Sequence, residues 1–433
     1  MAAFGLVILF ILAILVISLP RQKVFIPFIL CVCYLTIGVT INFAGFNLYS
    51  YRILAIAGII RVIARGELNV LKLTKIDIVF TIWAAVSVIT YTILFGSFKA
   101  FFFKFANSLD AICLYYCFRC VITDFDDLER IFKYISIAII PLSLFFLYES
   151  RTMHNLFSAF GGVEFISEVR DGKMRCEGPF RHPILAGMFG VTVFPFIIWQ
   201  WWKQQRPTAL IFISIAASLI IVFTATSSGA LLSLLAEIFA LFVWFFRDKL
   251  NLVRWSAVLG LFLLSMIMKA PIWYIIARVS NFSGGGGFHR AYLLDVAFKN
   301  IGRWWLVGTT YTADWFPYVL TVDPNNSDIT NQFLVQGISG GLITMGIFIA
   351  IIVYCFQSIG KSLKLLECAP FRNQFLIWTL GVTLFGHVVA FISVSYFDQI
   401  RVMWYLLLAA ISSITYFVEL NPQNNCSTPE GSV

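Results

Sequence analysis

Long, almost uninterrupted apolar stretches recur along this 433-residue chain and set the first limit on its fold. Residues 2–18 and 257–268 are nearly continuously apolar. Backbone polar groups inside a bilayer must be hydrogen-bonded within the protein, so only helices or closed β-barrels can cross it. Barrel strands alternate apolar and polar residues over about ten positions, and these stretches do not. We therefore expect an all-α polytopic integral membrane protein.

The composition supports the same class and limits the partners. Hydrophobic residues make up 60% of the chain and charged residues 12%, whereas soluble globular proteins carry roughly 25% charged residues. The net charge of +9 first reflects orientation, because Lys and Arg collect on the cytoplasmic side of membranes, so we expect no nucleic-acid partner. Cys117 and Cys120 form a pair without a second pair or nearby His, which predicts neither a metal site nor another cofactor.

Hydropathy predicts about twelve or thirteen transmembrane helices. The segment 48–65 is the least secure of them, because Arg52 and Arg61 interrupt it. The predicted spans are residues 2–19, 24–41, 48–65, 76–95, 98–118, 131–149, 183–201, 207–224, 229–246, 252–270, 333–357, 374–395 and 401–418.

Basic residues divide unequally between the two ends of these spans. Because positive residues collect in the cytoplasm, we expect the amino terminus and both long loops to face outward. If 48–65 does not cross, only the amino terminus changes side. One side holds seventeen basic residues in its connections and span ends, namely Arg21, Lys23, Arg61, Arg65, Lys72, Lys75, Arg119, Arg130, Lys133, Lys203, Arg206, Arg247, Lys249, Arg254, Lys361, Lys364 and Arg372. The short connections of the other side hold four, namely Arg52, Lys99, Lys104 and Arg401.

The span ends divide the chain into six segments. Two of these are long loops, and loops longer than about 12–15 residues in a compact assembly are usually functional or disordered. The layout is N-terminal transmembrane helices in 1–149, a first outer loop in 150–182, central transmembrane helices in 183–270, a large outer loop in 271–332, C-terminal transmembrane helices in 333–418 and a polar cytoplasmic tail in 419–433.

The first outer loop ends in Gly178-Pro179-Phe180-Arg181-His182-Pro183. Its two prolines and one glycine predict a rigid turn at a helix start. Arg181 and His182 would lie at the amino end of a spanning helix, where free N–H groups favour anions. A phosphate site is one interpretation. Snorkelling of an interfacial arginine is the other.

The second outer loop contains Arg278, a glycine run (Gly284–Gly287) and then residues 288–300, whose spacing predicts an amphipathic helix in the membrane interface. His289 and Arg290 fall on its first turn, where an anion would gain from the helix dipole and from a guanidinium. A solvated cap on a surface helix explains the same residues without a ligand.

A polar run, Asp323 to Phe333, closes the second loop and delivers Thr330, Asn331 and Gln332 to the mouth of the next span. Asp328 or Thr330 serving as the N-cap of that span accounts for one residue of the run. Such a cap does not account for the whole cluster.

These motifs together resemble those of the O-antigen polymerase and O-antigen ligase family. The similarity lies in Arg290 and Tyr292 on the loop helix, in the Trp-Trp-Leu-Val-Gly stretch Trp304–Gly308, and in Thr330-Asn331-Gln332-Phe333 before a glycine-rich span. The segment Arg175 to Gly187 resembles the first outer-loop motif of the family.

The resemblance implies an inverting, metal-independent glycosyltransferase acting at the periplasmic face of the bacterial inner membrane. Its donor would be a glycan on undecaprenyl diphosphate, and its acceptor another repeat unit or lipid A core. The family's outer-loop arginines hold the diphosphate, a role that maps onto Arg181 and Arg290, with Arg278 a weaker candidate. Arginine suits that role because it offers bidentate contact and fixed charge to the leaving diphosphate.

Two departures from the family pattern concern catalysis. The ligases carry a His before the Asn of the last motif, and here that position is Thr330, which is no useful base at neutral pH. His289, His182 and Asp328 remain as candidates for the base. The Ser-Arg pair common at a tight turn between two spans reads Ser227-Ser228-Gly229 here. Both departures favour a polymerase of O-antigen, capsule or exopolysaccharide over a ligase.

The substrate-binding expectations follow from the same motifs. Thr330, Asn331 and Gln332 would orient sugar hydroxyls. Trp304, Trp305 and Trp315 would stack on sugar rings, although an interfacial aromatic belt explains them equally well. The expected partners are the lipid-linked donor, the acceptor glycan or lipid A core, membrane lipids and a regulator of chain length.

A lipid-linked glycan transporter or flippase is the alternative from a different class. It predicts ionisable groups at mid-membrane depth, with broken helices around them. Within the predicted spans such groups are scarce: Lys104, Asp110, Glu237 and His387. The sequence also has no GxxxxGKS motif, which excludes a P-loop ATP-driven pump on this chain.

Overall fold

The computed structural model describes residues 2–43, 46–170, 172–203, 208–281, 287–316 and 326–421. Gly284–Gly286 of the predicted glycine run, Asp323–Asn325 of the polar run and the tail from residue 422 lie outside the described residues. The α-helices are α1 (Ala2–Ser18), α2 (Phe25–Tyr34), α3 (Ser50–Ala64), α4 (Lys75–Phe95), α5 (Phe98–Val121), α6 (Phe125–Thr152), α7 (Pro183–Lys203), α8 (Ala209–Thr224), α9 (Ser228–Val243), α10 (Leu250–Ile267), α11 (Ile275–Asn281), α12 (Gly287–Lys299), α13 (Ile301–Trp304), α14 (Gln332–Leu365), α15 (Phe371–Phe391) and α16 (Ile400–Leu420).

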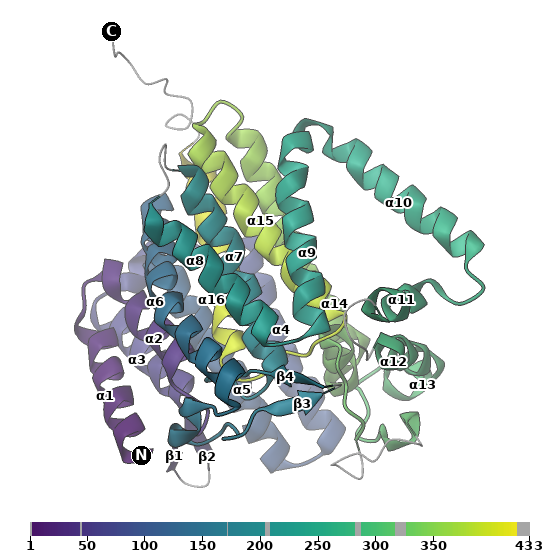
Figure 1. The fold of residues 1–433 in the computed structure, drawn as a ribbon, viewed down its shortest axis with the longest axis horizontal. Helices are drawn as coiled ribbons and strands as arrows, with labels where there is room; N and C mark the ends of the chain where they lie inside the picture. The colour runs from purple at the N-terminus through teal and green to yellow at the C-terminus, as the bar shows by residue number, and fades with distance from the viewer. Residues whose placement is uncertain are drawn as a thin grey trace.

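Short elements complete the fold. The 3-10 helices are η1 (Arg21–Lys23), η2 (Glu67–Val70), η3 (Leu156–Phe160), η4 (Trp244–Lys249), η5 (Ile272–Tyr274) and η6 (Ala313–Trp315). Two antiparallel hairpins are formed by β1 (Thr40–Phe43) with β2 (Phe46–Tyr49) and by β3 (Glu168–Arg170) with β4 (Lys173–Arg175). Both hairpins lie at the end of the bundle that also holds α12 and α13, the lower end in Figure 1, which we call the loop end.

The helices identify a multi-pass membrane protein. Among the described residues, seven helices are long and apolar enough to cross a bilayer, or eight if a bent pair counts as one span. The bent pair is Trp255–Ile267 with Ile272–Arg278, at 97°. The seven are Lys75–Phe95, Phe125–Thr152, Pro183–Trp202, Ser228–Val253, Gln332–Leu365, Phe371–Phe391 and Ile400–Leu420. The other predicted spans are also helical, but they are shorter or more polar.

Large apolar side chains remain exposed around the bundle, as expected of a surface that faces lipid rather than water. The exposed fraction is 63% for Ile14, 62% for Ile63 and Ile93, 61% for Leu144 and 58% for Phe239.

Side-chain caps fix where several spans begin. Thr74 and Asp77 form a capping box at the start of α4. Ser97 and Asp124 accept backbone hydrogen bonds at the starts of α5 and α6. These caps satisfy N–H groups that would otherwise lack partners at the helix ends.

The predicted span 24–41 is shorter than expected. Its helix, α2, ends at Tyr34, Leu35 is extended, and a turn at Ile37 and Gly38 leads into β1. The residues beyond the helix end are rich in β-branched side chains, including Thr36, Ile37 and Val39, which favour extended backbone. An apolar run alone did not distinguish these residues from the helix before them.

The two arginines that interrupt the predicted span 48–65 have buried partners. Arg52 Nη2 lies 2.6 Å from Asp110 Oδ2 on α5. Arg61 donates to the Val16 carbonyl at the end of α1, at 2.9 Å, and pairs with Glu67 at 2.9 Å. Buried charges are tolerated where they are paired and hydrogen-bonded, so α3 remains a helix within the bundle.

The helix α10 stands apart from the bundle, on the right of Figure 1. Every side chain from Trp255 to Ile267 is exposed. Its neighbours at its two ends are η4 and η5. A helix that is apolar all round and touches little protein is solvated by lipid, and it leads to α11 and α12 at the loop end.

The motif Trp304–Gly308 packs into a break in α14. At Gly341 the backbone has φ 73° and ψ 178°, and Leu342 N–H donates to the Trp305 carbonyl at 2.8 Å. Thr309 N–H donates to the Ile338 carbonyl at 2.9 Å. The broken helix thus regains backbone hydrogen bonds from another segment, as an interruption within a membrane protein requires.

A second, smaller core forms around this crossing. It is separate from the main core between the spanning helices. The Trp304 ring lies against Gly337, where an added Cβ would be 2.6 Å from the ring. The second core consists of Leu293, Val296, Ala297, Trp304, Trp315, Phe316 and Leu334.

We predict that Gly341→Ala destabilises the protein by roughly 1–3 kcal/mol, because its backbone region is accessible almost only to glycine. An added Cβ would also lie 2.1 Å from the Leu306 carbonyl oxygen. Gly346→Ala on the same helix is the matched control, since nothing lies within 4 Å of its added Cβ. Thermal unfolding of the purified protein in detergent measures both. Equal unfolding temperatures for the two variants would contradict the role of the break.

Candidate functional site: an arginine cluster at the loop end

The turn between α8 and α9 is the point on which the two long loops converge. Cys176 N–H donates to the Thr224 carbonyl at 3.0 Å, and the Thr226 hydroxyl donates to the Met174 carbonyl. Thr226 has a positive φ of 47°. Ser227 caps α9 by accepting from Ala230 N–H. The turn therefore holds the β3–β4 hairpin against the start of α9.

The hairpin brings two arginines to this place. Glu168 and Arg175 are register partners across it, and Arg175 Nη1 lies 2.7 Å from Glu168 Oε2. Arg175 is 5% exposed, and its Nε has no hydrogen-bond partner among the described residues. Arg170 ends the opposite strand. The buried guanidinium of Arg175 is therefore paired with the Glu168 carboxylate, and its Nε remains available as a hydrogen-bond donor.

Arg290 reaches the same turn from the first turn of α12. Its Nη1 donates to Ser228 Oγ at 3.1 Å, and an added Cβ on Gly229 would lie 3.9 Å from its Nη2. Burial, together with the positive charges of Arg170 and Arg175, lowers the pKa of Arg290. The three residues Arg170, Arg175 and Arg290, which we call the arginine cluster, thus repel one another beside the amino end of α9.

Two histidines border the arginine cluster. Burial, together with the positive charge of Arg175, lowers the pKa of His182. The negative charges of Glu168 and Asp328 act in the opposite direction. Burial likewise lowers the pKa of His289, although Asp328 acts in the opposite direction. The His289 ring stacks on Phe316 with the centroids 4.3 Å apart. Both imidazoles are therefore neutral at pH 7 and able to accept a proton.

The predicted rigid turn before α7 is present. Gly178 has a φ of 54°, and an added Cβ there would lie 2.5 Å from the ring of Phe146. Phe180 is fully buried, and His182 Nδ1 accepts from Ile184 N–H at 3.1 Å. The turn fixes His182 toward the arginine cluster.

Arg181 lies in different surroundings from Arg290. It lines a polar pocket of ≈ 400 Å³ together with Thr40, Tyr49 and Glu164. Burial raises the pKa of Asp398, and the positive charge of Arg181 acts in the opposite direction. Arg181 thus lines this pocket, whereas Arg170 and Arg175 are the arginines whose charges act on Arg290.

The polar residues at the start of α14 have partners within the protein. Asn331 caps α14 by accepting from Leu334 N–H at 3.0 Å and donates to the Ile392 carbonyl at 3.0 Å. Gln332 Oε1 accepts from Tyr396 N–H at 2.8 Å. The buried Thr330 hydroxyl has no hydrogen-bond partner among the described residues. Asn331, rather than Asp328 or Thr330, is the cap.

The remaining predicted residues are dispersed. Trp304 is 1% exposed and donates to the Ala297 carbonyl at 2.9 Å, so it is a core residue with no face open to a sugar. Trp315 is equally buried. Trp305 is 52% exposed. Arg278 is exposed on α11. Among the described residues, no group of three or more His, Cys, Asp or Glu side chains could hold a metal ion.

Sequence reasoning did not assign Arg170, Arg175 or Ser228 to the site. A signal for the first two was present, since two arginines spaced around Gly172 in a short alternating segment indicate a hairpin. Nothing in the sequence indicated that Ser228, 62 residues from Arg290, would be its hydrogen-bond partner.

A pair of buried carboxyl groups organises the first loop behind the cluster. Glu149 accepts from Ser167 Oγ at 2.8 Å and from the N–H groups of Glu177 and Gly178 at 2.9 and 3.0 Å. Glu177 accepts from Glu164 N–H at 3.1 Å. Burial raises the pKa of Glu177 to about 7, with Glu149 adding to the shift.

We predict that this loop is more stable at pH 5 than at pH 8. The folded pKa of Glu177, about 7, lies above its ordinary value of 4.5, so protonation favours the folded loop and the stabilisation is lost as the pH rises through about 7. Hydrogen exchange of the Asn155 and Ser167 amides, corrected for intrinsic rates, measures this, because both amides donate within the loop. Glu177→Gln should remove the difference. A loop equally protected at both pH values would contradict it.

Neither the models of known protein families nor the curated proteins match the chain in sequence. A function for the chain therefore has to follow from the geometry and charge of the arginine cluster and from the short motifs described above.

Proposed function

We propose that the chain is a glycosyltransferase that moves a glycan from undecaprenyl diphosphate to an acceptor glycan. It would polymerise repeat units of O-antigen, capsule or exopolysaccharide, with transfer to lipid A core as the alternative. In this proposal twelve or thirteen helices span the bacterial inner membrane, and the loop end faces the periplasm. The distribution of basic residues supports this orientation.

The observation that carries the proposal is the arginine cluster. Like charges held together at the end of an apolar bundle lower the cost of binding an anion there. The start of α9 adds its helix dipole, and the unused Nε of Arg175 offers a further donor. A lipid diphosphate fits, because its chain remains in the bilayer while its two phosphates reach the end of the spans.

The reaction follows from that placement. A hydroxyl of the acceptor attacks the anomeric carbon of the donor glycan from the face opposite the diphosphate. The carbon–oxygen bond to the phosphate breaks, and undecaprenyl diphosphate leaves with the electron pair. Arginines stabilise the charge that develops on the leaving oxygen. The proton of the hydroxyl passes to His289 or His182, both of which border the cluster in the neutral form.

Glu237 is the observation that favours a transporter instead. It is fully buried in α9, and neither of its carboxyl oxygens has a hydrogen-bond partner among the described residues. An ionisable group inside a membrane often marks a transport pathway. The two functions differ in a deletion strain, where loss of a polymerase leaves single lipid-linked units on the outer leaflet and loss of a flippase traps them on the inner one.

Arg290→Ala is predicted to lower transfer by roughly 2–4 kcal/mol in activation free energy, because it removes a charge-assisted contact to the leaving group. In a strain that lacks the native gene, this variant should let lipid-linked single units accumulate while long chains disappear. Arg303→Ala is the matched control from the same loop, since Arg303 is an exposed residue paired with Asp314. Mass analysis of lipid extracts and of chain length gives the readout.

Equal amounts of the Arg290 and Arg303 variants in the membrane make this comparison valid. Normal chain length with Arg290→Ala would remove the diphosphate role of the arginine cluster. Lipid-linked single units found only in the inner leaflet would favour the transporter over the glycosyltransferase.

The pH profile of transfer tests the base. Because the pKa of His289 is lowered, we expect kcat/KM to remain constant down to pH values below the usual histidine pKa of about 6.5 and then to fall as the imidazole protonates. His289→Ala should abolish this acidic limb. An unchanged profile in His289→Ala, with a changed one in His182→Ala, would assign the base to His182.

A further inference from the structure

The segment 392–399, which we call the 392–399 loop, connects α15 to α16. Its first residues pack against the start of α9. An added Cβ on Gly229 there would lie 3.0 Å from Ser393 Oγ and 3.9 Å from Arg290 Nη2. The beginning of the 392–399 loop therefore lies beside the turn that Arg290 reaches.

The other end of the 392–399 loop is fixed close to Arg181. The Gln399 side chain donates to the carbonyls of Leu35 and Pro179, both at 2.9 Å. Pro179 belongs to the rigid turn before α7 that also carries Arg181. The charge of Arg181 acts on Asp398, the residue before Gln399. One short segment thus extends from the arginine cluster to the surroundings of Arg181.

Asp398 is held there in an unfavourable state. Its φ of 53° lies in the left-handed region, which residues other than glycine rarely adopt. It is 8% exposed, and its Oδ2 has no hydrogen-bond partner among the described residues. Burial raises the pKa of Asp398, although Arg401 and Arg181 act in the opposite direction. At neutral pH the charged carboxylate therefore lowers the stability of the folded protein.

The next residue also has a buried acceptor that is not used. Gln399 is 1% exposed, and its Oε1 has no partner within the part of the chain that the structure describes, although its Nε2 donates twice. Such buried acceptors are rare, because each has lost its hydrogen bonds to water. Strained residues cluster at ligand sites. Two unused acceptors on consecutive residues, one of them strained, indicate a place where a ligand supplies the donors.

We propose that Asp398 binds the acceptor glycan, with its carboxylate accepting a hydrogen bond from a sugar hydroxyl near Arg181. This inference rests on the proposed function and adds to it a residue that holds the acceptor. A hydroxyl donates without bringing charge, whereas the carboxylate would repel an anion and the two arginines would repel a cation. The 392–399 loop would then hold the acceptor at one end and border the diphosphate of the donor at the other.

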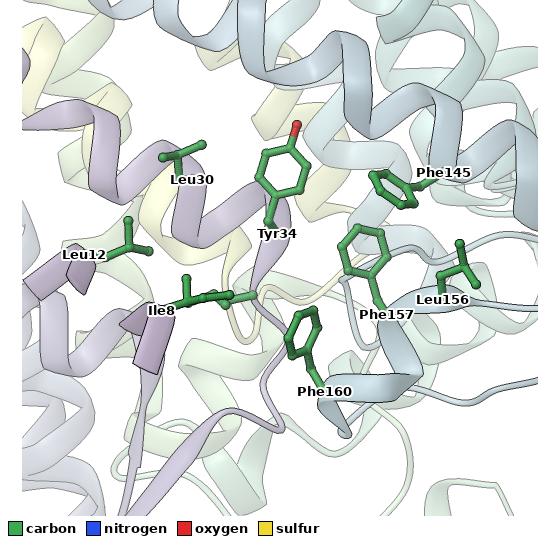
Figure 2. Close-up of a pocket in the computed structure, with 9 residues that line it drawn as sticks. Ile8, Leu12, Leu30, Tyr34, Phe145, Leu156, Phe157 and Phe160 are labelled. Atoms are coloured by element: carbon green, nitrogen blue, oxygen red, sulfur yellow. The ribbon is translucent and has the colours of Figure 1, made fainter. Parts of the chain in front are cut away.

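The apolar pocket of ≈ 310 Å³ between α1, α2, α6 and η3 offers a glycan no such partners. Figure 2 shows its lining, to which Leu30 and Phe157 contribute apolar side chains. The Tyr34 hydroxyl already donates to the Ala138 carbonyl at 2.6 Å. Sugar hydroxyls would lose their hydrogen bonds to water in this pocket without replacement, so the acceptor is placed at the 392–399 loop.

Transfer by the full-length protein in liposomes tests Asp398. The donor is the lipid-linked unit extracted from the deletion strain, and the acceptor is the glycan that mild acid releases from it, labelled with a fluorophore at its reducing end. Asp398→Gly fits the left-handed backbone and removes both acceptor oxygens, so KM for the labelled glycan should rise roughly tenfold to a hundredfold. Asp398→Asn tolerates the same backbone and keeps one neutral oxygen, so a smaller rise is expected. In both variants kcat should stay close to the wild-type value.

Thermal unfolding in detergent separates binding from a structural role. Because the strained carboxylate disfavours the folded state, both Asp398 variants should unfold at or above the wild-type temperature while KM rises. Stability gained with function lost is typical of residues that serve a ligand. Met153→Gly is the matched control, since Met153 also has a positive φ of 66° but is 39% exposed and uncharged. It should keep the wild-type KM.

A wild-type KM in Asp398→Gly would overturn the assignment, as would a raised KM with a lowered unfolding temperature in both Asp398 variants. If the wild type transfers nothing, the proposed function itself is contradicted, and fluorescence anisotropy of the labelled glycan without donor still tests the site. The glycan should bind the wild type and Met153→Gly equally, and Asp398→Gly roughly tenfold to a hundredfold more weakly. Equal affinity for all three proteins, or binding to none, would refute the role of Asp398.

Discussion

Repulsion between guanidinium groups is the constraint on which the loop end of this protein depends. Arg170, Arg175 and Arg290 are held beside one turn, with Glu168 as a close carboxylate. This arrangement is electrostatically unfavourable, so the rest of the fold must hold the three side chains in place. The scaffold here is the α8–α9 turn, which fixes the hairpin through Cys176 and Thr226. An anion bound there would offset this electrostatic cost, and the proposed function rests on that argument.

The membrane imposes a second condition, which is that backbone and charge must be satisfied within the bundle. Arg52 in α3 meets this condition through Asp110, and the interruption of α14 at Gly341 meets it through residues 305–309. The glycine-rich span and the Trp-Trp-Leu-Val-Gly motif are therefore two sides of one contact. Their joint presence in a sequence reflects packing as much as chemistry.

Much of the fold was predictable from the sequence, because a bilayer allows few solutions to a long apolar run. The rigid turn before α7 and the helix that carries Arg290 are present where expected, and seven or eight of the twelve or thirteen predicted spans are long apolar helices among the described residues. The end of α2 was not predictable, since the apolar run continues without a break past Tyr34 and periodicity alone does not mark where a helix stops. The site was predictable only in part. The positions of Arg290 on a loop helix and of His182 before α7 could be predicted from their neighbours in sequence. The hydrogen bond of Arg290 to Ser228 and the burial of Trp304 depend on contacts between distant segments.

The two halves of the arginine cluster are supported by different cores. The hairpin with Arg175 rests on the main core, whereas α12 with Arg290 rests on the small core around Trp304, and α10 connects the two without packing along the bundle. The distance between the guanidinium groups of Arg175 and Arg290 therefore depends on how the small core packs against α14. Trp304 packs on Gly337 and donates to the Ala297 carbonyl, and its volume there influences that spacing. A side chain with no access to solvent is in this way a determinant of how the three guanidinium groups are spaced.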